Sequence, residues 1–420
     1  MTDFAMHAYY NPHLASGATS VDAIVTVTAD GGTGLSIDSY PRAAEVLLVD
    51  VSGSMGPPTR KLHEAKHAAA VAIGCLRDGV EFAVLAGSDY ATMVYPSEPR
   101  LVVASEASRA DALLALQQLA AGGGTAIGRW LRAAHDLLGG DRDRLNHVTL
   151  LTDGQNGERA KSFQSQLRAC EGHFRCDCRG VGIDWKVDEL RAIADRLLGT
   201  VDIVRDPAGL KDDFRALMAA SMAKRVDDVQ LRVWTPAGAT VELVAQLEPD
   251  IVELSDRRVG DGPLLGDYPV GAWGCESRDY HVRIRVPARA LGDEMLAARL
   301  SIVKNSVALA QYTLAVTWTD DLALSTKLVG QLEHYVAQEE GLIAVRDALS
   351  AIDAGDTAHA GEQLRLARRL AVRTGHSSRI AEIDRLLDPD TGVLRAHIDK
   401  GDHMELATRA VRTIRIHKTG

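Results

Sequence analysis

Three polar side chains alternate directly after an apolar run near residue 50. The run Val46–Val49 is followed by Asp50, Ser52 and Ser54, with Gly53 between the two serines. A short apolar run that ends at turn residues is typical of a buried parallel strand. Carboxylate and hydroxyl oxygens are hard ligands, which suit Mg²⁺, with Mn²⁺ or Ca²⁺ as alternatives, and do not suit zinc. The stretch therefore predicts an oxygen-lined cation site at the end of a strand.

Two further stretches each add one oxygen ligand. A second apolar run begins at Leu145 and ends in the carboxylate of Asp153, and Thr125 follows three consecutive glycines in a loop before a predicted helix. Open α/β sheets bind ligands at the carboxyl ends of their strands, where the strand order reverses. If the order is 3-2-1-4-5-6, the strands that end at Asp50 and Asp153 are neighbours at that point, and the five oxygen side chains converge.

The pattern Asp50-x-Ser52-x-Ser54, then Thr125 after a glycine run, then Asp153, resembles the metal-ion-dependent adhesion site (MIDAS) of von Willebrand factor type A (vWA) domains. The resemblance covers about residues 43–222 and points to the intracellular bacterial type. It implies that the two serines and Thr125 bind the ion directly, whereas the two aspartates act mostly through water or hydrogen bonds. Neutral ligands leave the charge of a cation poorly compensated, so an open coordination position attracts an anionic oxygen.

The resemblance implies that this last ligand is an Asp or Glu carboxylate of a partner protein. The hypothesis is a non-enzymatic interaction module, a possible member of a multi-protein assembly, in which the glycine run lets the Thr125 loop shift when the partner binds. Two alternatives stay open, namely a metal-dependent hydrolase at this cleft or at the helix of His63, and a scaffold with a purely structural metal. Hydrolysis is disfavoured because only Arg60 and Lys61 near the motif could clamp a substrate.

Strands and helices that alternate along residues 43–222 must position these side chains. They predict an α/β fold with a doubly wound, mostly parallel six-stranded sheet of Rossmann-like type. Besides the run from 145, strands are expected at 45–50, 82–85, 91–95, 179–182 and 201–204, with a variable edge at 101–103. Helices are expected at 59–76, after the Pro pair at 57–58, and at 108–119, 127–138, 160–170, 187–197 and 210–222.

The flanking regions show two other patterns. Residues 223–319 contain strands with alternating apolar and polar residues, and turns rich in Gly, Pro and Asp separate these strands. This pattern predicts an antiparallel β-sandwich. Residues 1–42 hold one alternating strand at 21–29 that completes the sandwich, since a lone strand is not stable. The vWA domain is therefore expected as an insertion in the sandwich. Residues 320–420 predict a helical domain, with helices at 324–338, 342–352, 358–372 and 379–387.

Composition limits the classes of function. The net charge of −10 and the pI near 5.8 argue against a nucleic-acid or membrane partner. No apolar run approaches eighteen residues, the start shows no signal peptide, and five cysteines fit a reducing compartment, so a cytoplasmic protein is expected. The basic tail is interpreted as a solvated edge rather than a polyanion hook. Its cations are Arg409, Arg412, Arg415 and Lys418.

Two further motifs contain residue types that commonly bind metals. The segment His63–His67 matches the zinc-protease pattern H-E-x-x-H, but both histidines are predicted on the polar face of their helix and no third ligand follows at the usual spacing. A second cluster, of Cys170, His173, Cys176 and Cys178, could bind zinc. Its last two cysteines alternate along a predicted strand, which favours ordinary buried thiols.

Overall fold

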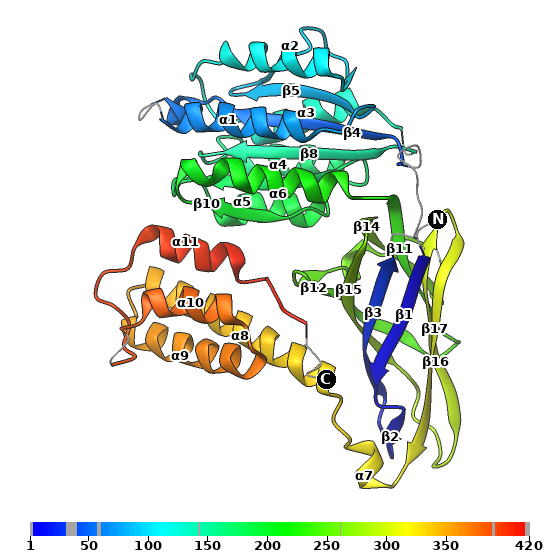
Figure 1. Ribbon diagram of the computed structural model, residues 1–420. Coiled ribbons are helices and arrows are strands. Elements are labelled where there is room, and N and C mark those ends of the chain that lie inside the picture. Colours follow the sequence, from blue (N-terminus) through cyan, green and yellow to red (C-terminus); the bar gives the residue numbers. More distant parts are fainter. Residues whose placement is uncertain are drawn as a thin grey trace. The chain divides into compact units, whose positions relative to one another are not determined.

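The computed structural model describes residues 3–30, 40–56, 60–141, 143–260, 262–388 and 391–415. The chain forms two compact units, which are drawn in Figure 1. One unit combines Met1–Leu35 with Asp228–Gly420, and the other is Ser36–Asp227. Because the first unit is built from two separate chain segments, the second unit is an insertion between them.

The inserted unit is an α/β domain with a seven-stranded sheet. Its strands are β4 (Ala43–Asp50), β5 (Glu81–Gly87), β6 (Ala91–Tyr95), β7 (Val102–Val103), β8 (Leu145–Thr152), β9 (Arg175–Val181) and β10 (Val201–Val204). The order β10-β9-β8-β4-β5-β6 is the expected 3-2-1-4-5-6 when it is numbered along these six strands. The prediction of six strands was wrong, because the expected edge segment forms β7, which pairs with β5 through two residues and is too short to show a period.

The two central strands of this sheet, β4 and β8, are buried along their whole length and pair in parallel. The helices of this unit are α1 (Arg60–Cys75), α2 (Glu106–Gln117), α3 (Ile127–Leu138), α4 (Ala160–Cys170), α5 (Val187–Arg196) and α6 (Leu210–Met222). Helix α1 buries a stripe of alanines that ends at Ile73 and contacts β4, α2 and α6. The predicted helix start at 57–59 lies outside the described residues.

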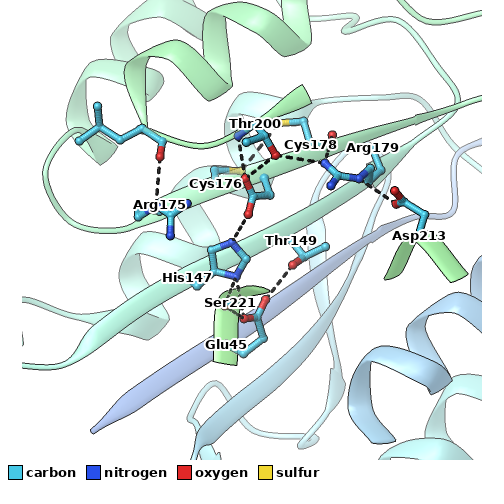
Figure 2. Close-up of polar contacts among 12 residues, drawn as sticks. Glu45, His147, Thr149, Arg175, Cys176, Cys178, Arg179, Thr200, Asp213 and Ser221 are labelled. Atoms are coloured by element: carbon cyan, nitrogen blue, oxygen red, sulfur yellow. Dashed lines mark hydrogen bonds and ion pairs between the residues drawn. The ribbon is translucent and has the colours of Figure 1, made fainter. Parts of the chain in front are cut away.

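A buried ion network crosses the amino-terminal halves of β4, β8 and β9 (Figure 2). The His147 imidazole lies between two carboxylates, with Nδ1 2.7 Å from Glu45 Oε2 and Nε2 2.8 Å from Asp177 Oδ2. Thr149 donates a hydrogen bond of 2.8 Å to Glu45, and the Thr200 hydroxyl donates one of 2.8 Å to Asp177. Buried charges are tolerated only when they are paired in this way.

The pairing decides the charge of the imidazole. Burial alone would lower the pKa of His147, but Glu45 and Asp177 outweigh it and raise the pKa to about 9. Burial likewise acts to raise the pKa of Asp177, yet the contacts with His147 hold it well below the ordinary value. The histidine is therefore a buried imidazolium at neutral pH, and it ties β4, β8 and β9 together.

The other unit contains two five-stranded sheets among the described residues, ordered β1-β3-β15-β12-β13 and β14-β11-β16-β17-β2. Their strands are β1 (Asp3–Tyr10), β2 (His13–Ala15), β3 (Ser20–Asp30), β11 (Val226–Trp234), β12 (Thr240–Glu248), β13 (Val252–Glu253), β14 (Leu265–Trp273), β15 (Glu276–Arg285), β16 (Glu294–Lys304) and β17 (Val307–Thr319). The strand expected at 21–29 is β3, which pairs antiparallel with β1 and β15. One pairing departs from the antiparallel expectation, since β2 runs parallel to β17.

The C-terminal region of this unit is helical. Its helices are α7 (Leu322–Ser325), α8 (Gly330–Asp353), α9 (Thr357–Thr374), α10 (Ser377–Leu386) and α11 (Lys400–Arg409). The prediction of two separate helices at 324–338 and 342–352 was wrong, because one helix, α8, continues through Gly341, where it packs against Leu370 of α9. Helix α11 was not predicted. Within the described residues, none of the helices has the length and apolarity needed to cross a membrane.

A buried aspartate of the sandwich receives hydrogen bonds from the helical region. Arg415 donates from Nε and Nη2 to Asp279 at 2.8 Å each, the Tyr335 hydroxyl donates to the same carboxylate, and Thr26 donates at 2.7 Å. Asp279 is only 2% exposed. The interpretation of the basic tail as a solvated edge is therefore wrong at Arg415, which is a structural tie, whereas Lys418 lies outside the described residues.

We expect His147→Gln to lower the free energy of unfolding of the α/β unit by about 3 kcal/mol, since it leaves two buried carboxylates without a cation. The contribution of His147 is fully present below pH 6.5 and is lost as the pH rises through about 9, because folding raises its pKa. Urea unfolding at pH 6, 7.5 and 9.5 measures this loss. His67→Gln, on the exposed face of α1, is the control, and an equal effect of both variants would contradict the prediction.

We expect Asp279→Asn to destabilise the sandwich and helical unit by about 3 kcal/mol, because the Arg415 guanidinium loses its buried counter-charge. Differential scanning calorimetry compares this variant with Asp256→Asn, which changes an exposed aspartate of the same unit. Identical unfolding temperatures for the two variants would show that the Asp279 cluster does not hold the tail.

Candidate metal centre

The five predicted oxygen ligands come from three loops at one edge of the α/β sheet. Asp50 is the last residue of β4. Ser52 lies just before the 3-10 turn Gly53–Met55, and Ser54 lies within that turn. Thr125 lies two residues before α3, and Asp153 directly follows β8. Because β4 and β8 are parallel neighbours, both aspartates emerge at the same edge.

Hydrogen bonds connect four of these residues in one chain. The Ser52 amide donates to Asp50 Oδ1 at 2.7 Å, and the Ser52 and Ser54 hydroxyls are 3.0 Å apart. Ser54 Oγ then donates to Asp153 Oδ1 at 2.6 Å. Thr152, which the sequence analysis did not select, donates at 2.5 Å to Asp50 Oδ2. Both oxygens of Asp50 are therefore held by neutral donors.

Thr125 joins this group around Gly154. A methyl group at Gly154 would lie 3.1 Å from Thr125 Oγ1, 3.3 Å from Ser54 Oγ and 3.8 Å from Asp50 Oδ2. Only glycine leaves this space between the three side chains open. The five predicted residues thus form one group, in which oxygens of Thr125, Ser54 and Asp50 surround Gly154 and hydrogen bonds add Ser52 and Asp153.

Backbone hydrogen bonds hold the Thr125 loop against its neighbours. Gly122 N donates to Val51 O at 2.7 Å, and Gly53 N donates to Gly123 O at 2.9 Å. On the other side, Gly157 N donates to the Thr125 carbonyl at 2.7 Å. Gly123 has a φ of +82°, a conformation that favours glycine. The three loops therefore position one another.

The centre is buried and rich in negative charge. The side chains of Asp50 and Asp153 are both 0% exposed. Burial raises the pKa of Asp50, although hydrogen bonds from Ser52 and Thr152 act against it. A nearby cation, Lys61 in the first turn of α1, has its Nζ 2.7 Å from Asp153 Oδ2. Burial opposes the charge of Lys61, but its contact with Asp153 raises the lysine pKa overall.

The donor set fits a hard divalent cation, since it consists of three hydroxyls and two carboxylates without nitrogen or sulfur. The other predicted metal motifs form no such centre. His63 and His67 are exposed on α1, and Cys176 and Cys178 are buried neighbours with sulfurs 3.9 Å apart. Among the residues with described positions, no three His, Cys, Asp or Glu side chains are grouped to hold a metal.

One arrangement of Ser, His and Asp has no signal in the sequence, because its residues are far apart along the chain. Ser221 Oγ lies 3.1 Å from His147 Nδ1 (Figure 2), and Asp177 Oδ2 contacts the other ring nitrogen, Nε2. However, Glu45 also contacts Nδ1, and the pKa of about 9 keeps the imidazole protonated at neutral pH. A protonated histidine cannot accept a proton from Ser221, so the imidazole does not act as the general base of a Ser-His-Asp triad.

Comparisons with known proteins agree with this architecture. The profile of the von Willebrand factor type A domain matches residues 44–203. A solved structure of a von Willebrand factor type A protein from Catenulispora acidiphila is 42% identical, with a TM-score of 0.93, and covers 99% of this chain and 98% of its own. The ArnB paralog VWA2 from Sulfolobus acidocaldarius shares the fold at 15% identity, with a TM-score of 0.60 and 98% of both chains covered.

An uncharacterized protein from Synechocystis sp. is 28% identical over 232 residues, which are 53% of this chain and 53% of that protein. The chain thus spans about half the length of this relative. The similarity to the Catenulispora protein extends over nearly all of both chains, at an identity that two proteins of one family share. This chain therefore belongs to the von Willebrand factor type A domain family.

Proposed function

We propose that this protein is a non-enzymatic binding module in which Mg²⁺, held by Ser52, Ser54 and Thr125, captures an acidic side chain of a partner protein. Domains of the vWA family commonly mediate metal-dependent protein interactions. The observation that carries the proposal is that Thr125, Ser54 and Asp50 converge around Gly154, while hydrogen bonds join Ser52 and the fully buried Asp153 to the same group. Mn²⁺ or Ca²⁺ could replace Mg²⁺ with the same oxygen ligands.

The residues of the centre have two roles in the proposal: some bind the ion, and others position the binding residues. The three hydroxyls supply neutral oxygens, while Asp50 accepts from the Ser52 backbone amide and fixes that turn, and Asp153 accepts from the Ser54 hydroxyl and orients it. A bound divalent ion supplies an electrophilic position for an anionic oxygen, because its neutral ligands compensate little of its charge. A carboxylate of a partner protein fits that position, and we place the interaction in the cytoplasm, within a multi-protein assembly.

The same geometry supports binding over hydrolysis. A hydrolase needs a base beside the metal and a cationic clamp for its substrate. Asp50 is committed to Ser52 and Thr152, and Lys61 is committed to Asp153. Lys61 also contacts Asp184, so a carboxylate engages it on either side. With these groups engaged, the centre is better suited to hold a ligand than to transform one.

We expect Thr125→Ala to weaken Mg²⁺ binding at least about tenfold, because it removes one of three hydroxyl ligands. Isothermal titration calorimetry of the full chain measures the affinity. Thr92→Ala, which removes an exposed hydroxyl from β6 of the same domain, is the matched control. Unchanged affinity in Thr125→Ala would remove this residue from the metal centre.

We expect partner proteins to bind only when the metal is present. Affinity capture from the native host with Mg²⁺, with EDTA and with Thr125→Ala identifies the proteins that depend on the centre. Replacement of the contacting Asp or Glu of such a partner by its amide should abolish its binding. Equal recovery in all three samples, together with a lower melting temperature in EDTA, would instead indicate a scaffold with a structural metal.

A further inference from the structure

A single lysine joins the metal centre to a more exposed carboxylate. Lys61 Nζ is 2.7 Å from Asp153 Oδ2 and 3.3 Å from Asp184 Oδ2. The side chain of Lys61 is 15% exposed, that of Asp153 is fully buried, and that of Asp184 is 59% exposed. The ammonium therefore bridges a buried acceptor inside the centre and an accessible acceptor at its rim.

The two oxygens of Asp153 face different partners. Oδ1 accepts from the Ser54 hydroxyl at 2.6 Å, whereas Oδ2 accepts from Lys61. A divalent cation held by the hydroxyls would share the Asp153 carboxylate with the ammonium. The divalent ion and the ammonium, both positive, would then lie close together beside one carboxylate. Such charges repel each other strongly where water is excluded, and Asp153 is fully buried.

We propose that Lys61 is a positioning residue that sets the cation affinity of the centre, because it competes with the divalent ion for Asp153 and shifts toward Asp184 when the ion binds. The inference rests on the proposed function, since it concerns the same metal. The transfer needs little movement, because Lys61 already contacts both carboxylates. The Asp184 carbonyl also accepts a hydrogen bond of 3.2 Å from Gln155, two residues after Asp153, so the rim and the centre are connected.

Competition by Lys61 has a second consequence for the loaded centre. Within the buried centre, two carboxylates, one ammonium and one divalent ion leave one excess positive charge, which the exposed Asp184 carboxylate offsets only in part because water screens it. The same buried centre without the ammonium is neutral. Lys61 therefore weakens the binding of the ion but strengthens the attraction of the loaded centre for an acidic ligand. Weaker binding of the ion alone and stronger attraction for the acidic ligand together favour a centre that binds its ion and its partner at the same time.

Isothermal titration of the full chain with MgCl₂ and with MnCl₂ tests the proposal. We expect Lys61→Met, which keeps the length of the side chain without its charge, to tighten ion binding at least about tenfold. Lys61→Arg keeps the charge and should retain the wild-type affinity. Lys66→Met, on the same helix, removes an ammonium that contacts the Gln117 carbonyl and should change nothing.

The rim carboxylate is tested by a double-mutant cycle. Asp184→Asn should weaken ion binding in the wild-type background, because Lys61 then loses the negative charge of its second acceptor, and should have a smaller effect beside Lys61→Met. Additive effects of the two substitutions would overturn the transfer to Asp184. Thermal unfolding of each variant without added ion verifies that it is folded.

The outcomes separate this inference from the function on which it rests. Ion binding by the wild type that Lys61→Met leaves unchanged or weakens would overturn the role of Lys61 alone. Failure of the wild type and of Lys61→Met to bind either ion would overturn the proposed metal centre itself. Tighter binding in both Lys61→Met and Lys61→Arg would show that packing, rather than charge, is responsible and would also overturn the competition.

Discussion

The burial of charge at the two ends of the parallel strands β4 and β8 is the constraint on which the α/β unit depends. A carboxylate that is removed from water must find donors or a cation, because its unpaired burial costs several kcal/mol. Strands β4 and β8 carry such groups at both ends, with Glu45 and His147 in their first halves and Asp50 and Asp153 at or just beyond their last residues. The packing around the sheet gives each of these buried groups a hydrogen-bond partner or an opposite charge.

The two ends meet this constraint differently. At the amino end, one imidazolium lies between two carboxylates, and hydroxyls complete the network, so the charges are compensated within the protein. At the carboxyl end, Asp50 receives only neutral donors, and Lys61 is the cation that contacts Asp153. The first end is suited to a structural role. The second end retains excess negative charge and free hydroxyl lone pairs, which a divalent ion can use.

Much of the α/β unit could be predicted because its signals are local. Strands β6 and β10 and helices α3, α4 and α6 have the expected bounds, since their apolar periods are clear and turn residues flank them. Elements without a clear period were missed, such as α11 and β14. The break predicted between residues 338 and 342 failed for a tertiary reason, because packing against α9 stabilises one continuous α8 through Gly341.

The sequence by itself determined the ligand types and their order, since Asp50, Ser52, Ser54, Thr125 and Asp153 stand next to strand ends and turns that local patterns reveal. Only the tertiary structure decided which charges meet. The ion pair of Lys61 with Asp153, the placement of His147 between Glu45 and Asp177, and the tie between Arg415 and Asp279 join residues 30 to 136 positions apart. No periodicity encodes such pairs, because they depend on side-chain directions and burial that exist only after the strands and helices have packed.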